Sequence, residues 1–183
     1  IEPRLTLGII GLGMVGMPLK RYVEERRGYI RGQTLFLFDT DPTKDYNDDI
    51  NKADVIFISV PTPRGKDGSA TTTAVEDAFA RLAGNKIAVI KSTVPPGTSE
   101  YFQKKYPQHQ VLFNPEFLTE ANAWNDFINP DRQVVAHGAS SKKHAKNIIK
   151  ILPKSDFAIF DIHSTEAELG KYASNVFGAL KVV

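Results

Sequence analysis

The sequence LTLGIIGLGMVG, residues 5–16, decides the fold. An apolar run leads into Gly11, Gly13 and Gly16, which are spaced as GxGxxG, and a helical pattern follows from residue 14 to about 26. In this order Gly11 permits a tight turn, Gly13 lets the backbone approach a diphosphate, and Gly16 lets the helix pack closely on the strand. We therefore predict a strand, a phosphate-binding turn and a helix whose positive N-terminus faces an anion.

A carboxylate follows the next apolar run. Asp39 comes directly after TLFLF, residues 34–38, and lies 23 residues beyond Gly16. At the end of a second strand, such a carboxylate accepts hydrogen bonds from both hydroxyls of an adenosine ribose and repels a 2′-phosphate. The cofactor that this pattern favours is NAD rather than NADP. A glycine turn of purely structural purpose with a loop aspartate is the alternative.

The rest of the chain alternates short apolar runs with amphipathic stretches. Further strands are expected at residues 54–60, 86–91, 110–113, 133–137 and 156–160, and helices at about 73–83, 98–105, 119–126 and 141–150. Several runs are apolar throughout, as strands covered on both faces are. The sequence therefore predicts an α/β protein with a doubly wound, mainly parallel sheet and helices on both faces, the Rossmann-type fold. Residues 39–52 are poor in apolar residues and predict an acidic loop with at most one helical turn, in which Asp45, Asp48 and Asp49 contact only solvent.

Composition restricts the class of protein. The 183 residues, with 23 Lys+Arg against 21 Asp+Glu and 42% hydrophobic residues, are typical of one soluble domain, which we expect to be cytoplasmic. No apolar run reaches the roughly 18 residues of a membrane span, and no basic stripe indicates a nucleic-acid partner. The absence of cysteine excludes a thiolate metal site and a cysteine nucleophile. We expect no metal site, and we expect the four histidines at the surface or in turns: His109, His137, His144 and His163.

The final stretch, residues 164–183, has a helical pattern of apolar residues at mostly three- and four-residue spacing. Thr165 and Glu168 predict a capping box at its start. No Gly, Pro or polar stop ends the pattern before Val183, so the sequence is expected to be part of a longer polypeptide. We predict a domain over residues 1–163, followed by the start of a long connecting helix.

Two proline-rich turns follow predicted strands, at the edge where open α/β sheets bind ligands. Thr62 lies in PTP after the run at 54–60, and Thr93 lies in STVPPGT after the run at 86–91. Because proline fixes the backbone angle φ, both hydroxyls are expected to be held rigidly, as suits a cofactor site. Simple crossover turns, with Thr98 capping the next helix, are an equally good interpretation.

Two pairs of polar residues are spaced four apart. Glu116 and Glu120 lie in NPEFLTEANA, residues 114–123, and on a helix they would share one face and could relay protons. A solvated helix face is the alternative. Lys171 and Asn175 form the second pair, and Asn175 interrupts a largely apolar turn. A buried cation and amide there could bind an oxyanion.

These motifs together resemble the nucleotide-sugar 6-dehydrogenases, which include the UDP-glucose, GDP-mannose and UDP-N-acetylmannosamine dehydrogenases. The resemblance runs through GLGMVG, VPTP, KSTVPPGT, NPEFLTEANA, NPDR at residues 129–132 and the helix that carries Lys171 and Asn175. It implies oxidation of a sugar C6 alcohol to a carboxylate with two molecules of NAD. It also implies a catalytic cysteine farther along the family's chain, so this sequence alone is expected to bind NAD without completing the oxidation.

The resemblance further implies a role for each matching residue. The cofactor is held by Gly11, Gly13, Met14, Val15, Gly16, Asp39, Val60, Thr62 and Thr93. The substrate side comprises Glu116, Phe117, Leu118, Glu120, Lys171 and Asn175. Among these, Glu120 is the acid/base, Lys171 stabilises the developing alkoxide with Asn175 beside it, and Thr93 positions a water. The partner is a nucleotide sugar, its pocket is completed by further domains, and the full-length protein is a homodimer.

The sequence departs from the family pattern in two places. The segment at 39–54 is much shorter than the family's usual connection, and Thr119 stands where the family often has arginine. The short segment favours a second interpretation, the wider group of β-hydroxyacid dehydrogenases, which includes the 6-phosphogluconate type. A nucleotide-binding or assembly module without catalysis, with the last helix as a dimer surface, is a third.

Overall fold

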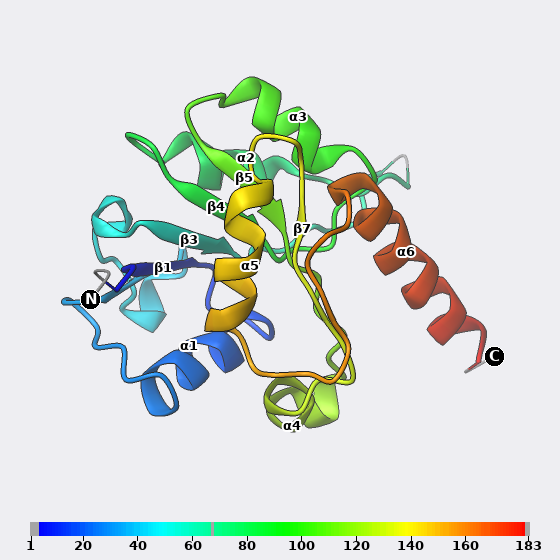
Figure 1. Cartoon of the computed structure of the whole chain (residues 1–183), viewed down its shortest axis with the longest axis horizontal. Helices are drawn as coiled ribbons and strands as arrows, with labels where there is room; N and C mark the ends of the chain where they lie inside the picture. Colours follow the sequence, from blue (N-terminus) through cyan, green and yellow to red (C-terminus); the bar gives the residue numbers. More distant parts are fainter. Residues whose placement is uncertain (1–3, 67, 182–183) are drawn as a thin grey trace.

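A six-stranded sheet forms the centre of the molecule in a computed structural model that describes residues 4–66 and 68–181 (Figure 1). Its strand order is β2-β1-β3-β4-β5-β7. The five parallel strands are β1 (Leu7–Ile10), β2 (Leu35–Phe38), β3 (Val55–Ile58), β4 (Ile87–Ile90) and β5 (Gln110–Phe113), and β7 (Ala136–His137) is antiparallel to β5. The helices are α1 (Gly16–Glu25), α2 (Thr73–Ala80), α3 (Thr98–Lys105), α4 (Ala123–Ile128), α5 (Lys142–Ile151) and α6 (Ser164–Leu180).

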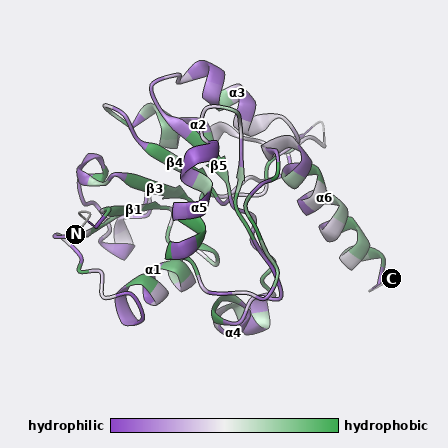
Figure 2. Cartoon of the chain, in the orientation of Figure 1, coloured by the Kyte–Doolittle hydropathy of each residue, from purple (hydrophilic) through white to green (hydrophobic). Residues whose placement is uncertain are grey.

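Alternating side chains of the strands pack into two apolar layers, one on each face of the sheet. Leu7 and Ile9 of β1 pack with residues of α1, α4 and α5, whereas Ile10 packs with residues of α2 and α3. The central strands are buried on both faces, and Figure 2 shows them as the most continuously apolar part of the ribbon. The expected doubly wound sheet with helices on both faces is confirmed.

The direction in which the sheet is built reverses at β1. The chain passes from β1 to β2 on one side and then to β3 on the other side, after which β4 and β5 continue outward. The carboxyl ends of β1 and β3 therefore lie next to each other, and the backbone N–H of Ser59 donates to the carbonyl oxygen of Ile10. In open α/β sheets a crevice forms at such a reversal, and ligands bind there.

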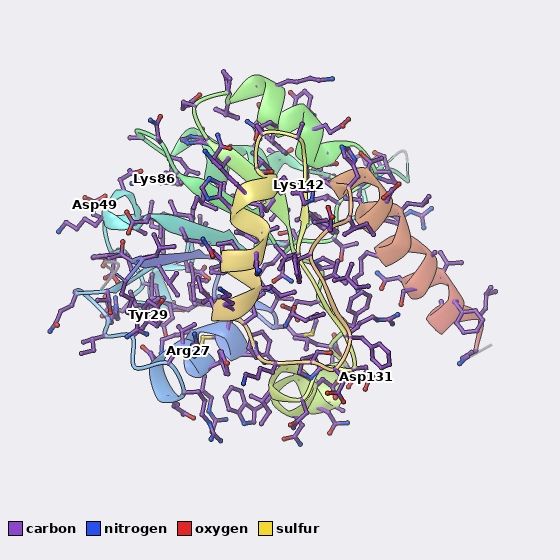
Figure 3. All side chains as sticks on the ribbon, in the orientation of Figure 1. Arg27, Tyr29, Asp49, Lys86, Asp131 and Lys142 are labelled. Atoms are coloured by element: carbon purple, nitrogen blue, oxygen red, sulfur yellow. The ribbon has the colours of Figure 1, made fainter. Side chains whose placement is uncertain are left out.

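The short connection between β2 and β3 covers the outer edge of the sheet. It holds two 3-10 turns, η1 (Pro42–Lys44) and η2 (Ile50–Lys52), where the sequence predicts at most one. The buried Ile50 packs so tightly on β1 that a Cβ at Gly8 would lie 2.7 Å from its Cδ1 atom. Lys86, labelled beside Asp49 in Figure 3, donates to the carbonyl oxygens of Asn51 and Ala53.

Asp48 is a structural residue of this connection, so the expectation of an acidic loop that only contacts solvent is wrong. Its carboxylate accepts a hydrogen bond from the N–H of Leu37 on the edge strand, at 2.9 Å, and forms an ion pair with Arg31 at 3.0 Å. Burial acts to raise the pKa of Asp48, but these contacts outweigh it and hold that pKa below 3.8.

We expect this carboxylate to make stability depend on pH. Because its pKa is lower in the folded chain than in the unfolded chain, its stabilisation is present above pH 3.8 and is lost as the pH falls below that value. Urea unfolding at neutral pH and at about pH 3 measures the free energy of unfolding at each pH. The decrease between the two should be smaller for Asp48→Asn than for the wild type. Asp77→Asn, at an exposed position of α2, is the control. Equal losses in Asp48→Asn and the wild type would contradict this assignment.

The region after β5 differs from the expected single strands at 133–137 and 156–160. The first splits at Val135, so that β6 (Gln133–Val134) pairs with β8 (Ala158–Ile159) in a separate two-stranded sheet and β7 pairs with β5. The side chain of Asn114 accounts for the split, because its amide nitrogen donates a hydrogen bond to the carbonyl oxygen of Val134 at 2.6 Å. β8 belongs to this two-stranded sheet and both its residues are exposed, so the run at 156–160 adds no strand to the main sheet.

Side chains from other segments change the expected caps and surface positions. The capping box of α6 consists of His163 and Glu166, not Thr165 and Glu168. His109 is buried but lies in the bend between α3 and β5, in keeping with the expected turn, whereas His137 is buried in β7, contrary to the expectation. His144 and His163 are partly exposed. The expectation that the last helix continues to the end of the sequence concerns Val182 and Val183, which lie outside the described residues.

Candidate functional site

The glycine turn after β1 has the geometry that its three glycines predict. Gly11 has a φ of +89°, and a Cβ there would lie 2.6 Å from the carbonyl oxygen of Ser59. A Cβ at Gly16 would lie 1.9 Å from the carbonyl oxygen of Gly11, so the helix start and the turn are in direct backbone contact. At Gly13, by contrast, no atom lies within 4 Å of the position of a Cβ. The turn is closed on the side of the sheet and open outward at Gly13.

The N-terminus of α1 opens onto this space. Its N-cap residue, Val15, supplies no side-chain hydrogen bond, and the first turn carries no acidic residue. The N–H groups at the start of a helix attract anions, and a bare backbone turn lets a diphosphate approach them closely. The open space at Gly13 and the uncapped helix therefore fit the diphosphate of a dinucleotide.

Asp39 lies at the end of β2, next to the glycine turn. Its carboxylate accepts hydrogen bonds from the N–H of Leu12 at 2.7 Å and from the ammonium of Lys44 at 2.9 Å. Burial acts to raise the pKa of Asp39, but these bonds and one from the N–H of Asp41 lower it further than burial raises it. The contact between Lys44 and Asp39 is not predicted from the sequence. There, only the position of Lys44, five residues after Asp39, points to it.

We expect Asp39→Ala to weaken NAD binding and to reduce the preference for NAD over NADP. The substitution removes the acceptor for the ribose hydroxyls and releases Lys44, whose ammonium could then pair with a 2′-phosphate. NAD affinity should fall about 10- to 100-fold, and NADP affinity should fall less or rise. Calorimetric titration with both dinucleotides measures the ratio. Asp45→Asn removes a charge from the same loop and is the control. An unchanged ratio would rule out this role.

A cleft connects the glycine turn with the ends of β3, β4 and β5. The lining residues come from five separate segments: Met14, Val15, Ser59, Val60, Pro61, Thr62, Lys91, Ser92, Thr93, Glu116, Leu118 and Lys171. The loops after β3 and β4 are tied together, because the hydroxyl of Thr62 donates to the carbonyl oxygen of Thr93 at 2.7 Å. A second such bond runs from the hydroxyl of Ser92 to the carbonyl oxygen of Val60 at 2.6 Å. The two threonine turns thus form one wall.

Charged side chains also line this cleft. Glu116 forms an ion pair with Lys91, and it also acts electrostatically on Lys171 of α6. Burial lowers the pKa of the Lys171 ammonium, Arg132 lowers it further, and Glu116 opposes both. Lys171 donates to the side-chain oxygen of Asn175 at 2.8 Å, so this predicted pair exists. A half-buried ammonium beside a carboxylate can stabilise a developing negative charge or exchange a proton.

The ring of Phe117 lies close to two cations beside this cleft. Its ring centroid lies 4.1 Å from the guanidinium carbon of Arg132 and 5.0 Å from the Nζ atom of Lys171. A second cavity, lined by Phe117 and Arg132 among others, shares Glu116 and Leu118 with the cleft. Residues 116–118 therefore all line one or both of these cavities.

Glu120 lies apart from the residues that it was expected to join. The segment at 114–119 is not helical, and Glu120 begins the 3-10 turn η3 (Glu120–Asn122), so Glu116 and Glu120 do not share a helix face. Glu120 is exposed and does not line the cleft. The reason is local: the N–H and hydroxyl of Thr119 both donate to Asp126, which delays the start of α4 to Ala123. Asn175 is also exposed, contrary to the expected buried amide.

Within the described ranges, residues 4–66 and 68–181, no group of three or more His, Cys, Asp or Glu side chains is arranged to hold a metal ion. In the same ranges, no helix has both the length and the apolar character needed to cross a membrane.

A family model matches residues 39–154, which is more than half of the chain, and describes the NAD-binding domain of the UDP-glucose/GDP-mannose dehydrogenase family. The chain belongs to this family. Its cofactor is therefore NAD, in agreement with the open glycine turn and with Asp39. The family also distinguishes between the interpretations left open by the sequence, in favour of a nucleotide-sugar dehydrogenase domain over the β-hydroxyacid type.

Individual members of the family support this assignment. A UDP-glucose 6-dehydrogenase from Rickettsia conorii is 38% identical over 151 residues, which cover 76% of this chain and 34% of that protein. The solved structure of a UDP-glucose dehydrogenase from Pyrobaculum islandicum is 28% identical, with a TM-score of 0.78 over 99% of this chain and 52% of that one. A GDP-mannose dehydrogenase from Pseudomonas aeruginosa, at 24% identity, has the same fold, with a TM-score of 0.81 over 97% of this chain and 51% of that one. The chain spans about a third of the length of the curated relative.

The match of the family model begins at Asp39 and ends before α6. The glycine turn and Lys171 therefore lie outside it, and their roles depend on the geometry described above. Thr93 and Glu116 lie inside it.

Proposed function

We propose that this chain is the NAD-binding part of a nucleotide-sugar 6-dehydrogenase, an enzyme that oxidises a sugar C6 alcohol to a carboxylate. The observation that carries the proposal is the cleft itself, which joins an open glycine turn to a carboxylate, Glu116, and a half-buried ammonium, Lys171. A module for binding alone has no need of such a charge pair beside the cofactor. The names of the relatives support the nucleotide sugar as the substrate class.

The residues of the chain would divide the work as follows. The glycine turn and the N-terminus of α1 bind the diphosphate, and Asp39 with Lys44 binds the adenosine ribose. Bound NAD supplies the hydride acceptor. The wall formed by Val60, Thr62 and Thr93 orients the nicotinamide side and keeps water out.

On the substrate side, Lys171 holds a proton at Nζ and stabilises negative charge on the substrate oxygen, with Asn175 fixing the ammonium. Glu116 is the carboxylate nearest this ammonium in the cleft. We propose it, in preference to the exposed Glu120, as the group that accepts a proton. The acid/base role expected of Glu120, and the placement of a water by Thr93, stay predictions.

The organisation beyond the described fold is also a proposal. Residues 1–163 form the domain, and residues 164–183 begin a connecting helix that takes part in a homodimer of the full-length, cytoplasmic protein. The exposed side chains of Leu169, Val176, Phe177 and Leu180 on α6 support the dimer, because apolar patches of this kind usually mark an interface. Figure 1 shows α6 projecting from the body of the molecule.

Titration of the folded chain with NAD in a calorimeter tests the proposal. Binding is expected at millimolar cofactor or below, and the absence of heat from a folded sample would overturn it. The chain has no cysteine to carry an acyl intermediate, so we also expect no sugar carboxylate when UDP-glucose or GDP-mannose is added with NAD. Formation of the carboxylate by this chain alone would show that the full oxidation proceeds without the family's cysteine.

A further inference from the structure

A fully buried lysine lies directly behind the charged side of the cleft. Lys91 follows β4, and none of its side chain is exposed. Its ammonium donates to the Oδ1 atom of Asn114 at 2.6 Å and forms an ion pair with the Oε1 atom of Glu116. A buried cation is costly in a sheet protein unless it is paired, and an apolar side chain of similar size would normally serve the core at least as well. Packing alone therefore gives no reason for an ammonium here.

Asn114 fixes the position of that ammonium. Its amide nitrogen donates to the carbonyl oxygen of Val134 at 2.6 Å and to the side-chain oxygen of Gln133 at 3.0 Å. Both donors of the amide are thereby used on the side of β6, so its single oxygen must face Lys91. A series of buried polar contacts thus runs from Gln133 through Asn114 to Lys91 and ends at Glu116. Each group in it can act as donor or acceptor in one way only.

Glu116 occupies the point where this buried chain meets the cleft. Its side chain is 14% exposed, and one carboxylate oxygen is held by Lys91. Among the described residues, the other oxygen, Oε2, has no hydrogen-bond partner. The other charged groups near the pair are Lys171, which interacts electrostatically with Glu116, and Arg132, which interacts with Lys171.

We propose that Lys91 is a positioning residue, whose buried ammonium holds one oxygen of Glu116 and thereby presents the other oxygen to the cleft beside Lys171. The proposal rests on the proposed function, because it explains how that site keeps a carboxylate aimed at a substrate. Burial lowers the pKa of Lys91, and Glu116 is the group that raises it again, which agrees with a coupled pair.

The absence of cysteine from the chain allows a test with a single synthetic side chain. Lys91→Cys can be alkylated in denaturant with 2-bromoethylamine, which restores an ammonium at nearly the length of lysine, or with 1-bromopropane, which gives a neutral side chain of the same length. After refolding, carbon-13 NMR follows the titration of the Glu116 carboxyl, which is assigned by its loss in Glu116→Gln.

The aminoethyl adduct is expected to reproduce the titration midpoint of the wild type. The propyl adduct should titrate about one pH unit or more higher, because the carboxylate has lost its nearest cation. A role in packing alone would give the two adducts the same midpoint, and that result, in folded samples, would overturn the proposal.

A second measurement applies if the neutral adduct does not fold. Coupling between two titrating groups is reciprocal, so Glu116→Gln should lower the pH at which Lys91 loses its proton by a similar amount, as nitrogen-15 NMR of Nζ reports. An unchanged Lys91 titration would overturn the proposal.

Titration of the wild-type chain with NAD separates this inference from the proposed function. A normal charge coupling in a chain that does not bind NAD would leave Lys91 as the group that positions Glu116 and would refute the dehydrogenase site. NAD binding without the coupling would refute the role of Lys91 alone.

Discussion

Gly13→Ala is expected to leave the chain folded and to reduce its affinity for NAD about 100-fold. The added methyl group meets no atom within 4 Å in the chain itself, so the fold has nothing to lose. It projects instead into the open side of the glycine turn, where a diphosphate must approach the backbone closely. A 100-fold change corresponds to about 2.7 kcal/mol of binding free energy. Calorimetric titration with NAD gives the affinity, and urea unfolding gives the stability.

Two other glycines provide matched controls. Gly178 lies on α6 and also has no atom within 4 Å of its Cβ position, so Gly178→Ala should change neither NAD binding nor the fold. Gly16→Ala should instead reduce the stability of the free chain, because its methyl group would collide with the carbonyl oxygen of Gly11. If Gly13→Ala binds NAD as tightly as the wild type, the diphosphate does not lie on this turn.

Glu168→Ala is expected to lower the free energy of unfolding by about 3 kcal/mol. The buried carboxylate of Glu168 accepts hydrogen bonds from the N–H of Gly97 at 2.6 Å and from the N–H and hydroxyl of Ser99, at 2.8 and 2.6 Å. These donors belong to the start of α3, so alanine leaves the helix uncapped and a cavity beside it. Urea unfolding measures the loss.

Glu166→Ala is the matched control for this substitution. Glu166 lies one half-turn earlier on the same helix and is exposed. Its replacement by alanine removes the capping box and should lower the free energy of unfolding by about 1 kcal/mol or less. Losses of equal size in the two variants would show that Glu168 does not join α6 to α3.

The pH dependence of Glu168 has the opposite sign to that of Asp48. Burial raises the pKa of Glu168, against the opposing effect of its hydrogen bonds from Ser99 and Gly97. The folded chain therefore retains a proton above the ordinary value of 4.5, and its stability falls as the pH rises through that interval. The stability of the wild type relative to Glu168→Gln should decrease from pH 4.5 toward neutrality.

The sequence predicts the sheet and its ligand-binding edge well because both depend on local signals. Runs of four to seven residues contain the strands β1 to β5, and the three glycines occupy the positions that their spacing indicates. Such features require no knowledge of distant contacts.

Contacts between distant segments account for the failures. Thr165 and Glu168 have the spacing of a capping box, yet Glu168 caps a helix some 70 residues earlier in the chain. Asp126 holds Thr119 and displaces the start of α4, which moves Glu120 away from Glu116. Lys91 and Lys44 look like ordinary charged residues in the sequence, and only the fold shows that they contact Glu116 and Asp39.

The bond between Glu168 and the start of α3 has a mechanical consequence. The loop that carries Thr93 in the cleft wall continues through two prolines into Gly97, where α6 is attached. A five-residue arm with two prolines thus links the wall that holds Thr62 and Thr93 to the base of the projecting helix. We expect a ligand that displaces this wall to move the base of α6 with it.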